Sequence, residues 1–106
     1  MENLRIIQKE LKKKLDNKED IFLLDVRNPN EYKIAKIQNS VLISLPNLEK
    51  NIDKIPKNKE IVIYCHHGNR SFEAAKILAE KGFNVKSLVG GIDAWSRLVD
   101  KNIPQY

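Results

Sequence analysis

The chain is poor in several residue types, and these shortages restrict what it can be. It has one cysteine among 106 residues, so it cannot form an internal disulfide, as is usual for proteins of reducing compartments. No apolar run approaches the ~20 residues that cross a bilayer. The N-terminus also lacks the apolar segment of a signal peptide. We therefore expect a soluble, cytoplasmic protein that does not act on membranes.

Basic residues outnumber acidic ones, with 19 Lys and Arg against 14 Asp and Glu, and the formal net charge is +5. Such an excess attracts anions without sequence specificity. Lys12, Lys13 and Lys14 lie in a segment whose apolar residues recur at helical spacing, so they are predicted to form a solvated helix face. Basic stretches interleaved with aromatic residues, which single-strand binders use, are absent. We therefore expect anionic substrates or acidic partners and no nucleic acid.

The order of apolar and amphipathic segments predicts the fold class. Short apolar runs alternate with amphipathic stretches, which is typical of an α/β fold with helices on the faces of a sheet. Asn28-Pro29 is predicted to cap and start a short helix, Gly82 to end a helix, and Gly90-Gly91 to connect a strand tightly to a helix. Strands are predicted over residues 21–26, 41–43, 61–65 and 85–88, and longer helices over residues 4–15, 45–55, 71–81 and 93–99.

The single cysteine, Cys65, stands where an apolar strand ends and a helical pattern begins. Gly68 permits a positive φ in the intervening loop, Arg70 supplies a permanent cation, and Ser71 is a favoured helix N-cap. Backbone N–H groups of such a turn and the positive end of the helix can converge on an anion. An isolated cysteine is most often a small buried hydrophobic residue. This context instead predicts a nucleophilic thiolate.

Three stretches together resemble a known family. They are Leu23-Leu24-Asp25-Val26-Arg27 followed by Glu31-Tyr32, the loop Cys65-His66-His67-Gly68-Asn69-Arg70-Ser71 behind its strand, and Gly90-Gly91-Ile92-Asp93-Ala94-Trp95. In their order and separation, from about Ile21 to Trp95, they resemble a single-domain rhodanese-like sulfurtransferase. The resemblance implies one three-layer α/β domain over residues 1–106, with a mainly parallel central sheet flanked by helices.

The same resemblance implies sulfur transfer through a persulfide on Cys65. The thiolate would take the outer sulfur of a small-molecule donor, thiosulfate or a persulfide, and pass it to cyanide in an assay or to a thiol or protein cysteine in cells. Backbone N–H groups would stabilise the anionic sulfur, and Arg70 would hold an oxyanion. No metal or organic cofactor is expected. The predicted substrate-binding residues are His66, His67, Gly68, Asn69, Arg70 and Ser71.

Two other functions stay open. A cysteine phosphatase or arsenate reductase also places a thiolate beneath backbone amides and an arginine. The phosphatase signature, however, has one residue more between Cys and Arg than the four that separate Cys65 from Arg70. The second alternative is a noncatalytic regulatory or sulfur-binding module. It stays open because the family's usual Gly-His pair and the small-residue turn after it correspond here to Ala35-Lys36 and Asn39-Ser40.

Several other polar residues are assigned structural roles. His66 and His67 are adjacent, so their side chains diverge and do not supply the spaced ligands of a structural zinc site. General acid or base work by either histidine stays open. Asp25 and Arg27 follow an apolar strand, and we expect them to fix a turn, with Arg27 paired to Glu31 or another carboxylate.

Overall fold

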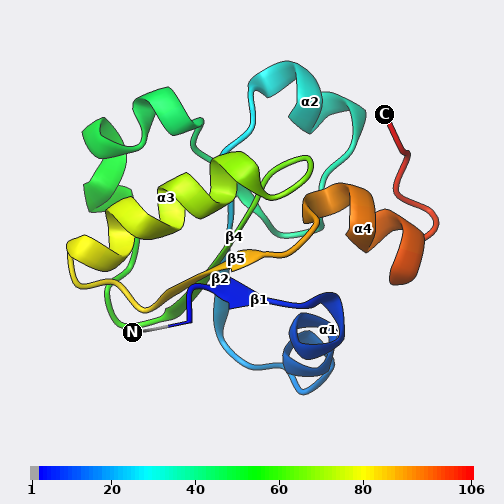
Figure 1. Cartoon of the computed structure of the whole chain (residues 1–106), viewed down its shortest axis with the longest axis horizontal. Coiled ribbons are helices and arrows are strands. Elements are labelled where there is room, and N and C mark those ends of the chain that lie inside the picture. The colour runs from blue at the N-terminus through cyan, green and yellow to red at the C-terminus, as the bar shows by residue number, and fades with distance from the viewer. Residues whose placement is uncertain (1–2) are drawn as a thin grey trace.

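A computed structural model describes residues 3–106 and shows three layers with a parallel sheet in the middle (Figure 1). The described residues form five strands in the spatial order β1-β5-β4-β2-β3, and every neighbouring pair is parallel. The strands are β1 (Arg5–Ile6), β2 (Ile21–Asp25), β3 (Val41–Leu42), β4 (Glu60–Tyr64) and β5 (Val85–Leu88). β4 is the central strand, so the residue that follows it lies at the middle of the sheet's carboxyl edge.

Helices cover both faces of the sheet (Figure 1). Because successive side chains of a strand point to opposite faces, the buried residues divide into two clusters. One cluster joins Leu24 and Ile63 to Leu78 of α3 (Asn69–Glu80). The other joins Leu23 and Val62 to Leu11 and Trp95, which belong to α1 (Gln8–Asp16) and α4 (Gly91–Leu98). The expected α/β architecture is confirmed, and its central strands are apolar on both sides, as buried parallel strands usually are.

Most predicted elements are confirmed to within two residues at each end. The strand predicted over 85–88 matches β5, and those predicted over 21–26, 41–43 and 61–65 differ from β2, β3 and β4 by one residue at an end. The short helix that starts at Pro29 is α2 (Pro29–Ile34). Asn28 caps it as expected, because its side chain accepts the Glu31 N–H while the Glu31 carboxylate accepts the Asn28 N–H.

The helix predicted over 4–15 is wrong in its first turn. Residues 5–6 form β1 and extend the sheet beside β5, and the helix begins only at Gln8. The backbone explains the difference. Ser87 donates its N–H to the Leu4 carbonyl at 2.7 Å, and Val89 donates to the Ile6 carbonyl at 2.9 Å. Pairing with the open edge of β5 outweighs the helical spacing of the apolar residues.

The continuous helix predicted over 45–55 is also wrong. The segment forms two 3₁₀ helices, η1 (Leu45–Asn47) and η2 (Glu49–Lys54), and Asn51 departs from helical geometry inside the second. Leu45 and Leu48, and then Ile52 and Ile55, lie three positions apart, which is the repeat of a 3₁₀ helix. These four side chains pack on the α3 face of the sheet.

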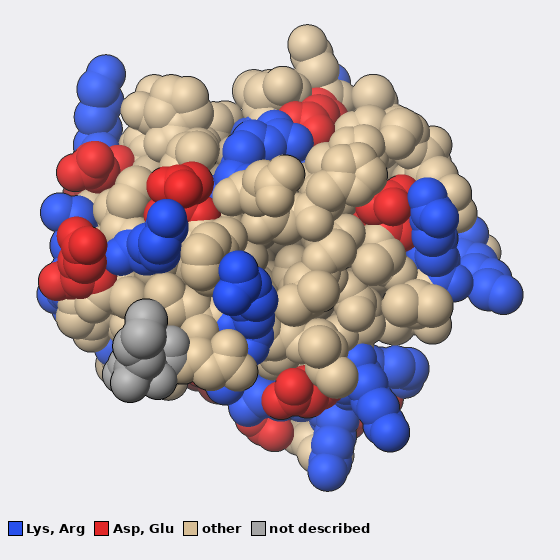
Figure 2. Space-filling view, in the orientation of Figure 1, with Lys and Arg blue, Asp and Glu red and all other residues tan. Residues whose placement is uncertain are grey.

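The lysines of α1 form an exposed surface, as the sequence predicts. Lys12 and Lys13 are exposed, and basic side chains gather over α1 at the lower margin of the face shown in Figure 2. Lys14 is half-buried and pairs with Glu60 at 3.1 Å and with Glu19 at 3.5 Å. Among residues 3–106, no helix combines the length and the apolar character needed to cross a bilayer.

Candidate active site

Cys65 lies at the carboxyl end of the central strand, and only 1% of its surface is exposed. The chain then curls around its sulfur. The N–H groups of Gly68 and Ser71 donate to Sγ at 3.1 Å and 3.3 Å. The first turn of α3 therefore points backbone donors and the positive end of the helix at one sulfur atom. This arrangement stabilises a thiolate, or a persulfide that replaces it.

The loop keeps this shape because two glycines remove side chains where segments meet. Gly68 has φ of 112°, and a Cβ at this position would lie 3.3 Å from the Gly90 nitrogen. Gly91 has φ of 60°, and a Cβ there would collide with the carbonyl oxygens of Cys65 and His66. These two carbonyls accept the N–H groups of Ile92 at 2.8 Å and Asp93 at 3.1 Å. The start of α4 thus supports the Cys65 loop from behind.

Ser71 is not the helix N-cap that the sequence predicts. α3 begins at Asn69 and Gly68 is its N-cap, so Ser71 lies in the first turn with its side chain buried. The Ser71 hydroxyl lies 3.4 Å from Sγ of Cys65, donates to the Gly68 carbonyl at 3.2 Å and lies 2.7 Å from the hydroxyl of Ser87. Its polar contacts below the sulfur fix its place inside the helix.

The two histidines of the loop lie in different surroundings. His66 stacks between His67 and Tyr106, with ring centroids 3.9 Å and 4.0 Å away. Burial and the neighbouring His67 lower the pKa of His66, and its Nε2 is buried without a hydrogen-bond partner among the described residues. His67 is exposed, with Nδ1 3.8 Å from a carboxylate oxygen of Asp93. Residues 3–106 contain no group of three or more His, Cys, Asp or Glu placed to hold a metal ion.

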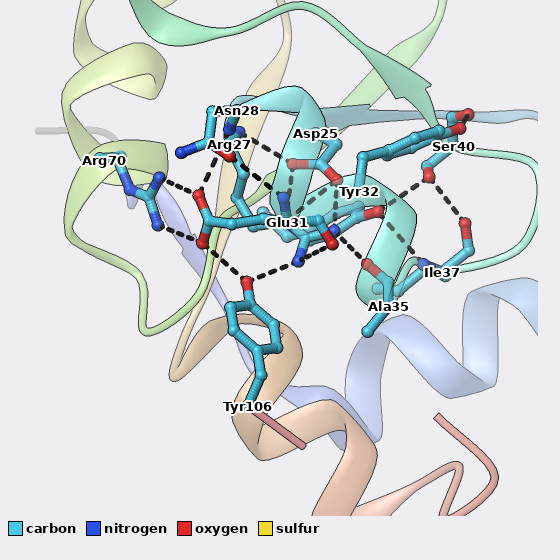
Figure 3. Close-up of polar contacts among 11 residues, drawn as sticks. Asp25, Arg27, Asn28, Glu31, Tyr32, Ala35, Ile37, Ser40, Arg70 and Tyr106 are labelled. Atoms are coloured by element: carbon cyan, nitrogen blue, oxygen red, sulfur yellow. Dashed lines mark hydrogen bonds and ion pairs between the residues drawn. The ribbon is translucent and has the colours of Figure 1, made fainter. Parts of the chain in front are cut away.

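Asn69 and Arg70 differ in their exposure and in their hydrogen bonds. Asn69 is exposed at the start of α3. Arg70 donates from both terminal nitrogens to the carboxylate of Glu31, at 2.6 Å and 3.0 Å (Figure 3). The hydrogen bonds from Arg70 and Tyr106 lower the pKa of Glu31 to about 2, and the same ion pair raises the pKa of Arg70. Within this structure, the guanidinium expected to hold an oxyanion is bound to a carboxylate of the chain itself.

Asp25 and Arg27 form a buried ion pair beside this site, as their expected structural role requires. Both side chains are fully buried, and the Asp25 carboxylate accepts the backbone N–H, Nε and Nη2 of Arg27 at 2.7–3.1 Å. Arg27 also donates to the Ala35 carbonyl at 2.5 Å and to the Tyr106 hydroxyl at 2.6 Å (Figure 3). Its carboxylate partner is Asp25, whereas the Glu31 carboxylate is bound by Arg70.

The segment in which the sequence departs from the family's pattern still forms an ordered turn. Ala35 ends α2 and presents its carbonyl to Arg27. Asn39 adopts φ of 69°, a conformation that asparagine tolerates better than most residues. The Ser40 hydroxyl donates to the Ile37 carbonyl at 2.7 Å and lies 2.8 Å from the Tyr64 hydroxyl. Polar contacts of this chain's own residues therefore hold the turn.

Sequence reasoning missed two residues of the site. Tyr106 lies 41 residues beyond Cys65, and nothing in its neighbourhood indicates that its hydroxyl joins Arg27 to Glu31. Ser87 looks like an ordinary polar residue of a strand, yet its side chain is buried against Ser71. Val85 is the one available signal, because it lies two positions before Ser87 and so shares its face of the strand, which predicts that Ser87 faces a packed layer.

Comparison with known proteins identifies the family of this chain. The sequence profile of the rhodanese-like domain family matches residues 7–98. A thiosulfate sulfurtransferase GlpE of Coxiella burnetii is 38% identical over 82 residues, which cover 76% of this chain and 77% of that protein. An adenylyltransferase and sulfurtransferase MOCS3-2 of Zea mays is also 38% identical, over 99% of this chain but only 23% of its own length. The chain thus spans about a quarter of the length of the MOCS3 relatives it matches.

The fold agrees with solved structures of similar chains. A rhodanese-like domain protein from Staphylococcus aureus has a TM-score of 0.84 at 28% identity, and the match covers 96% of this chain and 97% of that one. The CoADR-RHD protein of Bacillus anthracis has a TM-score of 0.85 at 33% identity, over 95% of this chain and 18% of its own. The chain belongs to the rhodanese-like family, and the relatives named above from Coxiella burnetii and Zea mays are sulfurtransferases.

Proposed function

We propose that this chain transfers sulfane sulfur from a donor such as thiosulfate to a thiophilic acceptor, through a persulfide on Cys65. The observation that carries the proposal is the convergence of the Gly68 and Ser71 N–H groups on Sγ, at 3.1 Å and 3.3 Å. A merely structural cysteine has no need of two backbone donors at its sulfur. Donors placed in this way stabilise negative charge without having to reorganise during the reaction.

The first half-reaction makes the persulfide. The Cys65 thiolate attacks the outer sulfur of thiosulfate, a bond forms between Sγ and that sulfur, and the donor's S–S bond breaks with its electron pair leaving on sulfite. The negative charge then lies on the new outer sulfur. The positive end of α3 favours this charge. Four residues separate Cys65 from Arg70, which suits a single outer sulfur better than a tetrahedral phosphate.

The second half-reaction discharges the persulfide to an external acceptor. Cyanide, a low-molecular-weight thiol or a cysteine of another protein attacks the outer sulfur, and the electron pair of the broken S–S bond returns to Sγ as the thiolate. The 106 residues contain no second cysteine that could attack the persulfide from within. Each half-reaction keeps the net charge and needs no oxidant or reductant.

A transfer assay with thiosulfate and cyanide tests the proposal. Thiocyanate should form with the wild type and not with Cys65→Ser. Ser44→Ala is a suitable control variant, because Ser44 precedes η1 without a side-chain capping hydrogen bond. An aryl phosphate assay on the same preparation tests the phosphatase alternative. If phosphate is released in a Cys65-dependent reaction and no thiocyanate forms, the phosphatase function would take the place of the proposed sulfur transfer. The absence of activity in both assays would favour a noncatalytic module.

A further inference from the structure

The anion-binding edge of Arg70 is occupied by a carboxylate of its own chain. Glu31 accepts from both terminal nitrogens of the guanidinium, at 2.6 Å and 3.0 Å (Figure 3). A bidentate pair of this kind uses the outer fork of the side chain, which is also the edge best suited to hold a sulfonate or sulfite. An incoming oxyanion must therefore compete with Glu31 for Arg70.

Glu31 is a fixed and permanent negative charge. It lies in the first turn of α2, where its carboxylate also accepts the Asn28 N–H at 3.3 Å and the Tyr106 hydroxyl at 2.8 Å. Its side chain is 15% exposed. Arg70 and Tyr106 approach the carboxylate from different sides, so it is held against rotation (Figure 3). Burial raises the pKa of Tyr106 to about 12, which keeps this phenol protonated as a donor.

Glu31 is linked to the Cys65 loop through Arg70, which belongs to the first turn of α3. The hydrogen bonds that Arg70 donates to Glu31, and the negative charge of Cys65, both raise the pKa of Arg70. Tyr106, which donates to Glu31, stacks on His66, the residue next to Cys65. The carboxylate is thus connected to the loop through two residues, Arg70 and Tyr106.

Most other ionisable groups around the loop are neutral or paired with an opposite charge, and the exception is Arg5, which is exposed and lines a pocket with His67, Gly68 and Asn69. The pKa of His66 is lowered by burial, so it is neutral at pH 7. His67 is exposed with Asp93 at 3.8 Å, and Asp93 also pairs with Arg97 at 3.2 Å. Arg27 is fully buried and neutralised by Asp25. The cation that follows Cys65 in the loop, Arg70, is therefore the one whose charge Glu31 offsets directly.

We propose that Glu31 is a specificity-determining residue that restrains Arg70 and selects donors that carry a single negative charge, such as persulfides and thiosulfonates, over the dianion thiosulfate. The inference rests on the sulfur transfer proposed above and names its donor class. With methanethiosulfonate the step balances as before. The bond from Sγ to the outer sulfur forms, the donor's S–S bond breaks, and methanesulfinate leaves with the electron pair in place of sulfite.

The test compares this matched pair of donors, which share the sulfur that is attacked and differ by one negative charge. Glu31→Gln keeps the shape of the side chain and can still close the capping box of α2. It should raise kcat/KM for thiosulfate relative to methanethiosulfonate by about five- to ten-fold, because it removes a charge near the reacting anion and loosens Arg70. Glu10→Gln makes the same charge change on the exposed part of α1 and should leave the ratio unchanged.

Alkylation of Cys65 provides a readout that needs no sulfur transfer. The Cys65 thiolate displaces iodide from both iodoacetate and iodoacetamide, and the two reagents differ by one charge. The rate with iodoacetate divided by the rate with iodoacetamide should rise in Glu31→Gln. It should rise less in Tyr106→Phe, which removes one hydrogen bond to Glu31, and stay unchanged in Glu10→Gln. A ratio that stays constant in Glu31→Gln, with either pair of reagents, would overturn the inference, and a ratio that falls would instead make Glu31 a group that orients Arg70 for anions.

The two proposals fail in different ways. If the wild type consumes neither donor, the proposed sulfur transfer is wrong, and the alkylation ratios still decide whether Glu31 repels anions from Cys65. If the wild type consumes both donors and Glu31→Gln changes neither ratio, sulfur transfer stands and the selection by Glu31 is wrong.

Discussion

Ser71 on α3 and Ser87 on β5 form a hydrogen bond between their hydroxyls at 2.7 Å, directly beneath the Cys65 loop. Both side chains are buried, and Ser71 also reaches the Gly68 carbonyl and lies 3.4 Å from Sγ of Cys65. The pair therefore connects the strand next to β4 with the turn that donates to the sulfur. It makes the position of that turn depend on a residue 22 positions beyond the cysteine.

Ser87→Ala should loosen this turn without unfolding the protein. Removing one partner of a buried hydrogen bond costs about 1–3 kcal/mol, and Ser71 retains its bond to the Gly68 carbonyl. We expect a loss of this size in the free energy of unfolding, measured in urea, and a several-fold fall in thiocyanate formation. Ser44→Ala should change neither quantity. An unchanged stability in Ser87→Ala would show that the pair does not hold the turn.

Gly91→Ala should damage the active loop far more than a comparable change elsewhere. A methyl group at Gly91 meets the carbonyls of Cys65 and His66, and the residue also has φ of 60°. Gly82 is the matched control, since its φ is 90° but a methyl group there would only lie 3.9 Å from Lys57 Nζ. Gly82→Ala should cost about 1–2 kcal/mol of unfolding free energy from backbone strain alone. Gly91→Ala should cost more and abolish transfer. Equal costs for both variants would contradict the buttressing role of α4.

The Glu31 ion pair should make part of the stability dependent on acid pH. The pKa of the Glu31 carboxyl is about 2 in the folded protein, against an ordinary value of 4.5. A depressed folded pKa means that the stabilisation is present above pH 4.5 and is lost as the pH falls toward 2. We expect a loss of about 1–2 kcal/mol, discounted because Arg70 is partly exposed. Urea unfolding of the wild type and Glu31→Gln between pH 7 and pH 3 measures it, and parallel curves would contradict it.

Arg70→Ala should lower activity with anionic donors for two reasons. It removes the guanidinium next to the loop, and it leaves the Glu31 carboxylate without its partner beside the reacting sulfur. We expect kcat/KM for thiosulfate to fall by about ten-fold or more, the scale of one charge-assisted hydrogen bond. Methanethiosulfonate should be affected less. Unchanged kinetics with thiosulfate would remove Arg70 from the site.

Local sequence was sufficient for much of the fold. Buried strands such as β2 and β4 are apolar on both faces, and the Asn28-Pro29 pair carries its own capping signal, so these elements could be placed from a few adjacent residues. β1 could not, because it is defined by hydrogen bonds to β5, which lies 80 residues away. Local spacing contains no information on such a partner.

The site divides in the same way. Cys65 and the loop could be identified because a strand, a glycine and a helix start follow one another in the sequence. The partner of Arg70 could not, because Glu31 reaches it from α2, and Tyr106, which donates to Glu31, comes from the segment after α4. Ser71 illustrates the same limit. Its residue type favours an N-cap, but a buried hydroxyl partner on β5 places it inside the helix.

The covalent intermediate gives the most direct prediction for Cys65. Because the chain offers no second thiol, a persulfide formed with thiosulfate should persist until an external acceptor arrives. Intact-mass measurement after removal of excess donor should show wild-type protein heavier by one sulfur atom, mapped to Cys65 and removed by cyanide or dithiothreitol. Ser44→Ala should gain the same mass and Cys65→Ser none. If the wild type turns over thiosulfate yet carries no sulfur even after rapid quenching, the two substrates must react with each other while both are bound. The backbone donors at Sγ would then have to stabilise a bound anion, not a covalent sulfur.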